Sequence, residues 1–167
     1  MKKTITITLY MSEIIYDIQN KTYLTGRSRK NGNNHEEVAN MQANDDDENL
    51  NQILRSVGNA FATLKTKLSE YIVEEKTTSN NEQISGDGNL QVGLTMPSNY
   101  NESTIDTISS ALHQYIVNSS IADWFVITNK TDATDYINMS TANMEQVRES
   151  INKRVRPARP EIETTAG

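Results

Sequence analysis

The sequence predicts a mainly α protein, a helical bundle of three to four helices with a small two-stranded β element and extended arms. Three long stretches repeat apolar residues at helical spacing, two short stretches alternate apolar and other residues, and the C-terminus combines prolines with cations. The 167 residues, 35% of them hydrophobic, suit one modest core. We therefore expect a single helical-bundle domain over residues 1–160 and a basic Pro-containing C-terminal arm over residues 153–167.

Two alternating segments make up the predicted β element. In residues 4–9 three apolar side chains alternate with three threonines. In residues 90–94 Leu and Val alternate with Gln and Gly, and Met96-Pro97 ends the pattern. We expect the two segments to pair. A two-stranded ribbon is marginal on its own, so its edges are also candidates for pairing with a neighbouring copy.

The first predicted helix begins at Ser12, a favourable N-cap residue, and ends near Gly26, a typical helix stop. Residues 27–34 are polar and rich in Asn, and they contain Gly32, which predicts a loop. Part of the acidic stretch that follows, residues 35–49, is a further helix candidate. The segment near 27–44 is therefore expected to be a flexible loop.

The strongest helical pattern in the chain covers about six turns. Its apolar face consists of Leu50, Ile53, Leu54, Val57, Phe61, Leu64, Leu68 and Tyr71. Asp45 and Glu48 have the spacing of a capping box at its start, and the pattern fades at residues 74–76. Residues 77–89 are poor in apolar side chains, which predicts a flexible loop or linker between two subregions.

Two more helices are predicted in the remainder of the chain. The face of the first contains Ile105, Ile108, Leu112, Tyr115, Ile116 and Ala122, and the face of the second contains Tyr136, Ile137, Ser140, Met144, Val147 and Ile151. Trp124 is the expected packing anchor. Because only a short turn at residues 129–132 separates the helices, they should form an antiparallel pair.

Charge is unevenly distributed along the chain, although the total is −6. Residues 1–30 carry +4 and residues 151–167 carry +2, whereas residues 31–50 carry −6 and residues 77–150 carry −7. Basic ends and an acidic middle favour head-to-tail contacts between identical subunits. The alternative is a set of solvated faces and tails.

The residue types that carry catalysis are sparse. The absence of cysteine excludes disulfides, thiolate metal sites and a cysteine nucleophile. His35 and His113 lack the spacing of a metal site or a catalytic pair, and the acids at 45–48 are better explained as a helix start. No phosphate-binding glycine motif occurs. We therefore expect no enzyme, no catalytic residue, no metal and no cofactor.

The C-terminal segment is the strongest candidate for binding a partner. Prolines cannot continue a helix, so Lys153-Arg154-Val155-Arg156-Pro157-Ala158-Arg159-Pro160 should leave the body as an extended arm. The predicted partner-binding residues of the arm and of the loop near residue 27 are Arg27, Arg29, Lys30, Lys153, Arg154, Arg156, Pro157, Arg159 and Pro160. Arginine forks bind carboxylates and phosphates alike. A protein partner, a nucleic acid and a merely disordered tail are the three interpretations.

No stretch reaches the roughly 20 apolar residues of a membrane span, and the alternating N-terminus differs from a signal peptide. The sequence is therefore expected to be that of a soluble, unexported protein without a membrane partner.

Three segments together resemble a known class of protein: residues 23–29, residues 59–65, and the block 122–125 that leads to residues 154–157. They are similar to small virion proteins of tailed phages of gut Bacteroides-type bacteria, over most of the chain. The organisation also resembles phage head–tail connector proteins, which are small helical bundles with extended arms.

The resemblance implies a structural, non-enzymatic, homo-oligomeric ring protein of the head–tail connector, neck or tail. It also implies portal, connector or tail proteins as partners, and a location in the virion after synthesis in the host bacterial cytoplasm. The alternative is a small intracellular nucleic-acid-associated or regulatory protein that uses the basic loop and tail, with nucleic acid as the secondary candidate partner.

Overall fold

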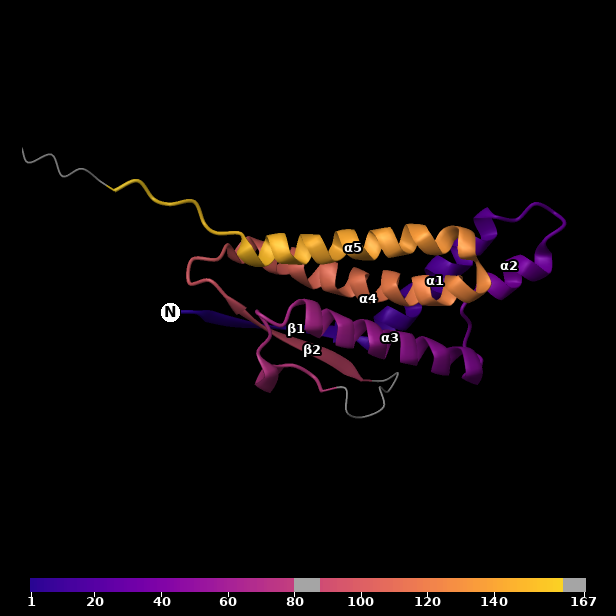
Figure 1. Cartoon of the computed structure of the whole chain (residues 1–167), viewed down its shortest axis with the longest axis horizontal. Coiled ribbons are helices and arrows are strands. Elements are labelled where there is room, and N and C mark those ends of the chain that lie inside the picture. Colours follow the sequence, from indigo (N-terminus) through magenta and orange to yellow (C-terminus); the bar gives the residue numbers. More distant parts are fainter. Residues whose placement is uncertain (80–87, 161–167) are drawn as a thin grey trace, which may run out of the picture.

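A computed structural model describes residues 1–79 and 88–160, and it shows a helical bundle packed against one face of a small sheet (Figure 1). The elements in chain order are β1 (Lys3–Tyr10), α1 (Met11–Ser28), α2 (His35–Met41), α3 (Asp47–Lys67), the short 3₁₀ helix η1 (Glu74–Lys76), β2 (Asn89–Met96), the 3₁₀ helix η2 (Glu102–Thr104), α4 (Ile105–Thr128) and α5 (Lys130–Asn152). The predicted fold class, mainly helical with a two-stranded β element, is confirmed.

The two predicted strands pair with each other. β1 and β2 are antiparallel, with Ile5 opposite Leu94 and Ile7 opposite Val92. The apolar side chains of both strands share the inner face, and the threonines of β1 lie on the outer face. The period-2 pattern therefore indicated both the strands and their buried side correctly.

α4 is the central helix of the bundle. It contacts α1, α2, α3, α5 and β1, so apolar residues are buried around much of its circumference. α5 runs back along it as the predicted antiparallel partner (Figure 1). The rings of Phe125 and Tyr136 meet edge to face at 5.4 Å between centroids. Trp124 is nearly buried, and its indole Nε1 donates a hydrogen bond to the Met41 carbonyl at 2.8 Å.

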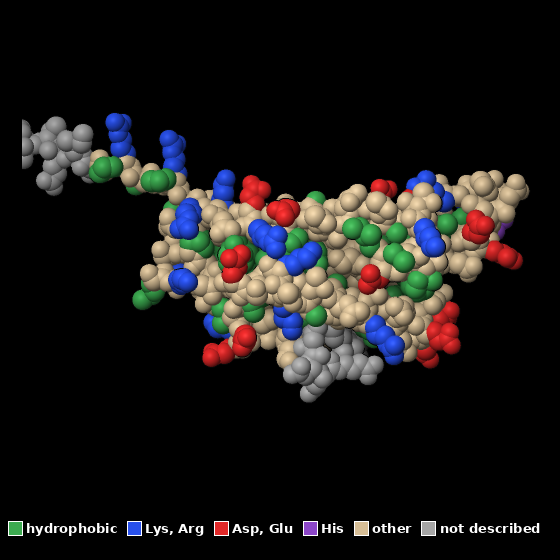
Figure 2. All heavy atoms as spheres, viewed as in Figure 1, with side chains coloured by type: hydrophobic (Ala, Val, Ile, Leu, Met, Phe, Trp, Pro, Cys, Tyr) green, Lys and Arg blue, Asp and Glu red, His purple; other side chains and the backbone are tan. Residues whose placement is uncertain are grey.

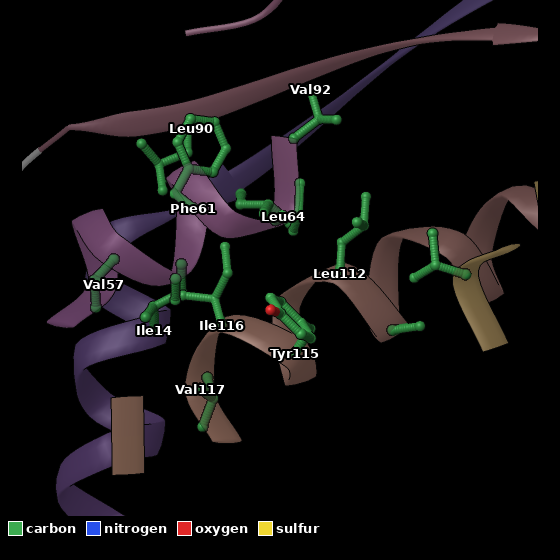
Figure 3. Packing of buried hydrophobic residues seen from close by; sticks show 14 of the residues in the cluster. Ile14, Val57, Phe61, Leu64, Leu90, Val92, Leu112, Tyr115, Ile116 and Val117 are labelled. Atoms are coloured by element: carbon green, nitrogen blue, oxygen red, sulfur yellow. The ribbon is translucent and has the colours of Figure 1, made fainter. Parts of the chain in front are cut away.

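The core lies where α3, α4 and the sheet meet. Phe61 and Leu64 of α3 lie beside Leu90 of β2 on one side and Ile116 of α4 on the other (Figure 3). Phe61 and Leu64 are both fully buried. Burying each such side chain contributes about 1.5–3 kcal/mol relative to exposure, so this junction is a main source of stability.

Half of the predicted flexible loop near residues 27–44 is helical, since it contains the end of α1 and all of α2, which lies within the helix candidate 35–49. α1 passes through Gly26, where a Cβ atom would lie 3.1 Å from the Val38 carbonyl oxygen. The glycine therefore permits the close approach of α2 rather than ending the helix. Ala43, just after α2, is fully buried, and its N–H donates to Thr22 Oγ1 at 3.0 Å.

The ends of α3 also differ from the prediction. α3 begins at Asp47 after the N-cap residue Asp46, and no side chain caps it, so the capping box of Asp45 and Glu48 is wrong. Asp45 Oδ1 instead accepts a hydrogen bond from Gln19 Nε2 at 2.5 Å. The acids of the first turn still complement the positive end of the helix dipole. The helix ends at Lys67, several residues before the predicted fade.

The chain after α3 runs along the outer edge of β2. The Thr95 N–H donates to the Tyr71 carbonyl at 2.7 Å, and the Val73 N–H donates to the Gly93 carbonyl at 2.9 Å. The Thr78 N–H likewise reaches the β2 backbone. The predicted loop at 77–89 is thus tied to the sheet at its start, whereas residues 80–87 lie outside the described residues, as do residues 161–167 of the arm.

Candidate functional site

The arm starts directly after α5 and is first held against the body. The Lys153 carbonyl accepts a hydrogen bond from the Asn101 N–H at 2.9 Å, and the Val155 N–H donates to the Asn99 carbonyl at 2.9 Å. Between them, Arg154 forms an antiparallel bridge with residue 100. The first three residues of the arm therefore add a short strand-like contact to the loop after β2.

Arg154 is also held by its side chain. Its Nη1 donates to Asn99 Oδ1 at 2.8 Å, so the guanidinium is oriented by the same loop that pairs with the backbone. Sequence reasoning missed this anchor at residues 99–101. The segment reads as an ordinary turn after Met96-Pro97, and no local pattern connects it with residues more than fifty positions away.

Beyond Val155 the arm leaves the body. Arg156, Pro157, Arg159 and Pro160 are all exposed, and Figure 1 shows the chain running away from the end of α5. Within the described part of the chain, neither Arg156 nor Arg159 has a hydrogen-bond or ion-pair partner. Prolines restrict the backbone to extended conformations, so the two guanidinium groups are presented on a pre-extended segment.

Two cations of the predicted basic loop lie at a hollow between α1 and α2. Arg27 and Lys30 line this hollow, whose volume is about 390 Å³, together with Tyr23 and His35. Both cations are exposed. The hollow can accept an anion through their side chains, but no buried polar group defines a fixed position within it.

Arg29 has an internal partner. Its guanidinium forms a two-point contact with the carboxylate of Asp132 on α5, with Nε 3.0 Å from Oδ2 and Nη2 bonded to Oδ1. Asn129 Nδ2 donates to the same Oδ2 at 2.5 Å. The hydrogen bond from Arg29 lowers the pKa of Asp132, although burial of the carboxyl acts in the opposite direction. Arg29 thus joins the end of α1 to the start of α5.

The predicted cations do not form one site. Arg27 and Lys30 lie where α1 meets α2, whereas the arm leaves the molecule at the opposite end of its long axis (Figure 1). A single compact ligand cannot contact both groups within one copy. The arm is therefore a separate candidate site.

One group of acidic side chains lies at the end of the molecule opposite the arm. They belong to the first turn of α2, with Glu36 and Glu37, and to the segment around the start of α3, residues 45–48. Figure 2 shows the cations of the arm at one end and acidic groups at the other, where Lys and Arg side chains also lie. The carboxylates of α2 and of the start of α3 are opposite in charge to the arm cations.

His113 has a partner that the sequence did not reveal. Its Nε2 lies 2.6 Å from Asp17 Oδ2 on α1, and next to this pair Lys21 Nζ donates to Gln114 Oε1 at 2.6 Å. Both contacts join α1 to α4. In the described ranges, no hydroxyl group is hydrogen-bonded to the His113 ring.

Within residues 1–79 and 88–160, no three His, Asp or Glu side chains gather closely enough to hold a metal ion. No helix in the same ranges combines the length and the apolar character of a membrane span.

Comparisons of the chain with models of protein families, with curated proteins and with solved structures found no match.

Proposed function

We propose that this protein is a non-enzymatic structural component of a tailed-phage virion, which forms an oligomeric ring at the head–tail connector, neck or tail. Its C-terminal arm docks on a neighbouring subunit. The observation that carries the proposal is an arm that is anchored at residues 99–101 and then extends, exposed, away from the body. The virion context rests on the resemblance of residues 23–29, 59–65 and the block 122–125 that leads to residues 154–157 to small virion proteins.

The distribution of charge supports head-to-tail docking. The exposed Arg156 and Arg159 lie at one end of the molecule, and the acids of α2 and of the start of α3 lie at the other. A contact between unlike ends is heterologous, and repeated heterologous contacts close into rings when the rotation between subunits permits. Arginine forks and carboxylates also match in geometry.

Shortening the arm tests this function. A chain that ends at Val155 keeps both backbone hydrogen bonds of the anchor and loses only the free part of the arm. We expect unchanged thermal unfolding but a smaller assembly, measured by sedimentation velocity and by native mass spectrometry. The double variant Arg156→Lys/Arg159→Lys is the matched control for charge, since lysine keeps the charge but loses the two-point geometry.

The proposal also predicts that the protein is present in purified virions, which mass spectrometry of the particles can measure. The proposal would be overturned if the protein were absent from the particles, or if the size of the assembly were unchanged when the free part of the arm is removed.

An intracellular nucleic-acid-associated role is the second candidate. It is favoured by the hollow at Arg27 and Lys30, where Tyr23 adds an aromatic ring to two exposed cations. The negative net charge weakens it, as does the position of this hollow at the opposite end of the long axis from the arm.

A further inference from the structure

One edge of the sheet has no partner within residues 1–79 and 88–160. On β2, the backbone groups of Gln91, Gly93 and Thr95 point away from β1, since they bond to the chain between residues 71 and 78. In an antiparallel pair the direction of the backbone groups alternates with each residue. The even-numbered residues of β2 therefore bond to β1.

The register then identifies the free groups of β1. Ile5, Ile7 and Leu9 pair with the even-numbered residues of β2, so their N–H and C=O groups point inward. The N–H and C=O groups of Thr4, Thr6 and Thr8 consequently point outward, and in the described chain they have no hydrogen-bond partner. Thr4 and Thr6 are also exposed. Such an edge is a template for another strand.

The sequence of this edge is self-complementary. Residues 4–8 read Thr-Ile-Thr-Ile-Thr in both directions. Two copies that pair antiparallel around Thr6 would place Thr4 opposite Thr8 and Thr6 opposite Thr6, all three pairs using outward groups. Ile5 would meet Ile7 of the other copy on the inner face. Threonine pairs and β-branched pairs of this kind stabilise antiparallel sheets.

Charge is complementary in the same register. Lys2 would lie opposite Tyr10 of the second copy, which borders a hollow of about 290 Å³ next to β1. Glu13 and Asp106 line this hollow, and Lys2 has no partner among the described residues of its own chain. The two-fold axis at Thr6 would generate this contact twice.

We infer that β1 is a dimerisation edge, whose partner is β1 of a second copy in an antiparallel arrangement with Thr6 on the two-fold axis. The result is a continuous four-stranded sheet in the order β2, β1, β1, β2. The C-terminal arm fits this edge poorly, because Pro157 and Pro160 lack an N–H and its first residues are already bonded to residues 99–101. The inference does not depend on the proposed virion role.

The first test replaces Thr6 by proline in the full-length chain. The Thr6 N–H is not used within one copy, so T6P should leave the fold intact and remove hydrogen bonds on the two-fold axis. We expect T6P to halve the mass of the paired species in sedimentation equilibrium, from an even multiple of 18.8 kDa. T6V, which keeps the N–H and a β-branched side chain, should retain the mass of the unsubstituted protein.

The second test determines the register of the pairing between two β1 strands by disulfide cross-linking. It does not depend on the folding of T6P. The chain contains no cysteine, so a single introduced thiol reports on one position. Residues of a hydrogen-bonded antiparallel pair have Cα atoms about 5.5 Å apart, within disulfide range. T6C should therefore give a covalent dimer on mild oxidation. T4C should not, because Thr4 of one copy lies about 13 Å along the strand from Thr4 of the other.

The outcomes separate clearly. Efficient cross-linking of T6C, together with little cross-linking of T4C, supports the inference. A monomeric T6C, equal cross-linking of T4C and T6C, or a folded T6P of unchanged mass overturns it. Shortening the arm should not alter T6C cross-linking, so failure of the arm-docking proposal and failure of this inference give different results.

Discussion

At the scale of single residues, the ion pair between Arg29 and Asp132 shows how a surface loop is tied to the bundle. The Asp132 side chain is 5% exposed, and the Arg29 side chain is 51% exposed. The buried carboxylate depends on donors from Arg29 and from Asn129. A buried charge that keeps its hydrogen bonds is tolerated, whereas one that loses them destabilises the fold. The main role of Arg29 is therefore to hold the start of α5 in position, and not to bind a partner.

The lowered pKa of Asp132 predicts a pH-dependent contribution to stability. Because the folded pKa lies below the ordinary value of 3.8, the contribution is fully present above about pH 4 and is lost as pH falls through the folded pKa. Asp132→Asn should lower the free energy of unfolding at neutral pH, and its difference from the unsubstituted protein should shrink in acid. Urea unfolding over a pH series measures both effects.

Glu145→Gln is the matched control for this prediction, since Glu145 forms an exposed pair with Arg148 at 3.5 Å. Exposed pairs contribute roughly 0–1 kcal/mol, so little change is expected at any pH. A difference for Asp132→Asn that stays constant down to acid pH would show that the carboxylate is not the stabilising group.

At the scale of elements, the sheet is completed on one side by the chain after α3. Gly93 allows this approach: a Cβ atom there would lie only 2.6 Å from Lys76 Cβ and 3.2 Å from the Val73 carbonyl oxygen. Thr77 Oγ1 accepts a hydrogen bond from the Gly93 N–H at 3.0 Å in the same place. The glycine in β2 is thus required by packing. It allows the chain after α3 to bond to β2 at one edge of the sheet, whereas the outer edge of β1 has no partner within residues 1–79 and 88–160.

Gly93→Ala should push the segment 73–76 away from β2. The expected loss is about 1–3 kcal/mol of unfolding free energy, the usual range for overpacking, measured by urea denaturation. The Val73 N–H should also exchange faster with solvent, because its acceptor is the Gly93 carbonyl. Thr95→Ala, on the same strand and face, is the control that adds no atoms. Equal effects of the two substitutions would contradict the packing argument.

The elements also show which features can be predicted from sequence. β1, β2, α4 and α5 have periodic apolar patterns, and all four were predicted. α2 has no buried residue, so it lacks a periodic apolar pattern, and residues 35–49 were predicted only as a helix candidate in part. Gly26 was predicted to end the first helix, but α1 continues to Ser28. Glycine is favoured both at helix ends and where two helices approach closely, so the sequence alone does not distinguish the two roles.

Long-range contacts escaped prediction for a different reason. Arg29 meets a carboxylate 103 positions away, and the arm is anchored by residues that read as a turn. For the candidate site, the prolines of the arm predicted that it is extended and exposed. The anchor and the internal role of Arg29 depend on tertiary packing, which no local pattern encodes.

At the scale of the whole molecule, the two proposed contacts use different parts of the surface. The arm lies at the opposite end of the long axis from α2 and the start of α3, and the second proposed contact uses the outer edge of β1 (Figure 1). A heterologous contact and a two-fold contact in one subunit together build assemblies with dihedral symmetry. Two rings that face each other across paired β1 strands are the simplest such assembly.

Salt dependence distinguishes this arrangement from a nucleic-acid-binding role. Binding to duplex DNA would fall linearly on a logarithmic salt scale, with a slope of about −0.9 for each contacted phosphate. We expect no specific binding to duplex DNA in fluorescence anisotropy at physiological salt. The pairing of β1 strands between copies should persist at high salt, because backbone hydrogen bonds and isoleucine contacts stabilise it and salt screens only charges.

The contrary result would be tight DNA binding whose slope decreases by about 2 in Arg156→Ala/Arg159→Ala. That outcome would assign the arm to phosphate contacts and favour the second candidate function. Lys65→Ala, a cation that lies over the Phe61 ring at 5.0 Å within the body, is the control for a general loss of charge.

Tyr100 gives the arm a mechanical connection to the sheet. Its backbone pairs with Arg154, its side chain is nearly buried, and the Lys3 ammonium at the start of β1 lies 5.7 Å from the centre of its ring. A pull on the arm is therefore transmitted through residues 99–101 into the sheet, and not only along the last turn of α5. Hydrogen bonds of such a bridge lie across the strand direction, so the tether resists tension by shear, and a load on the arm reaches the start of β1 through Tyr100 and Lys3.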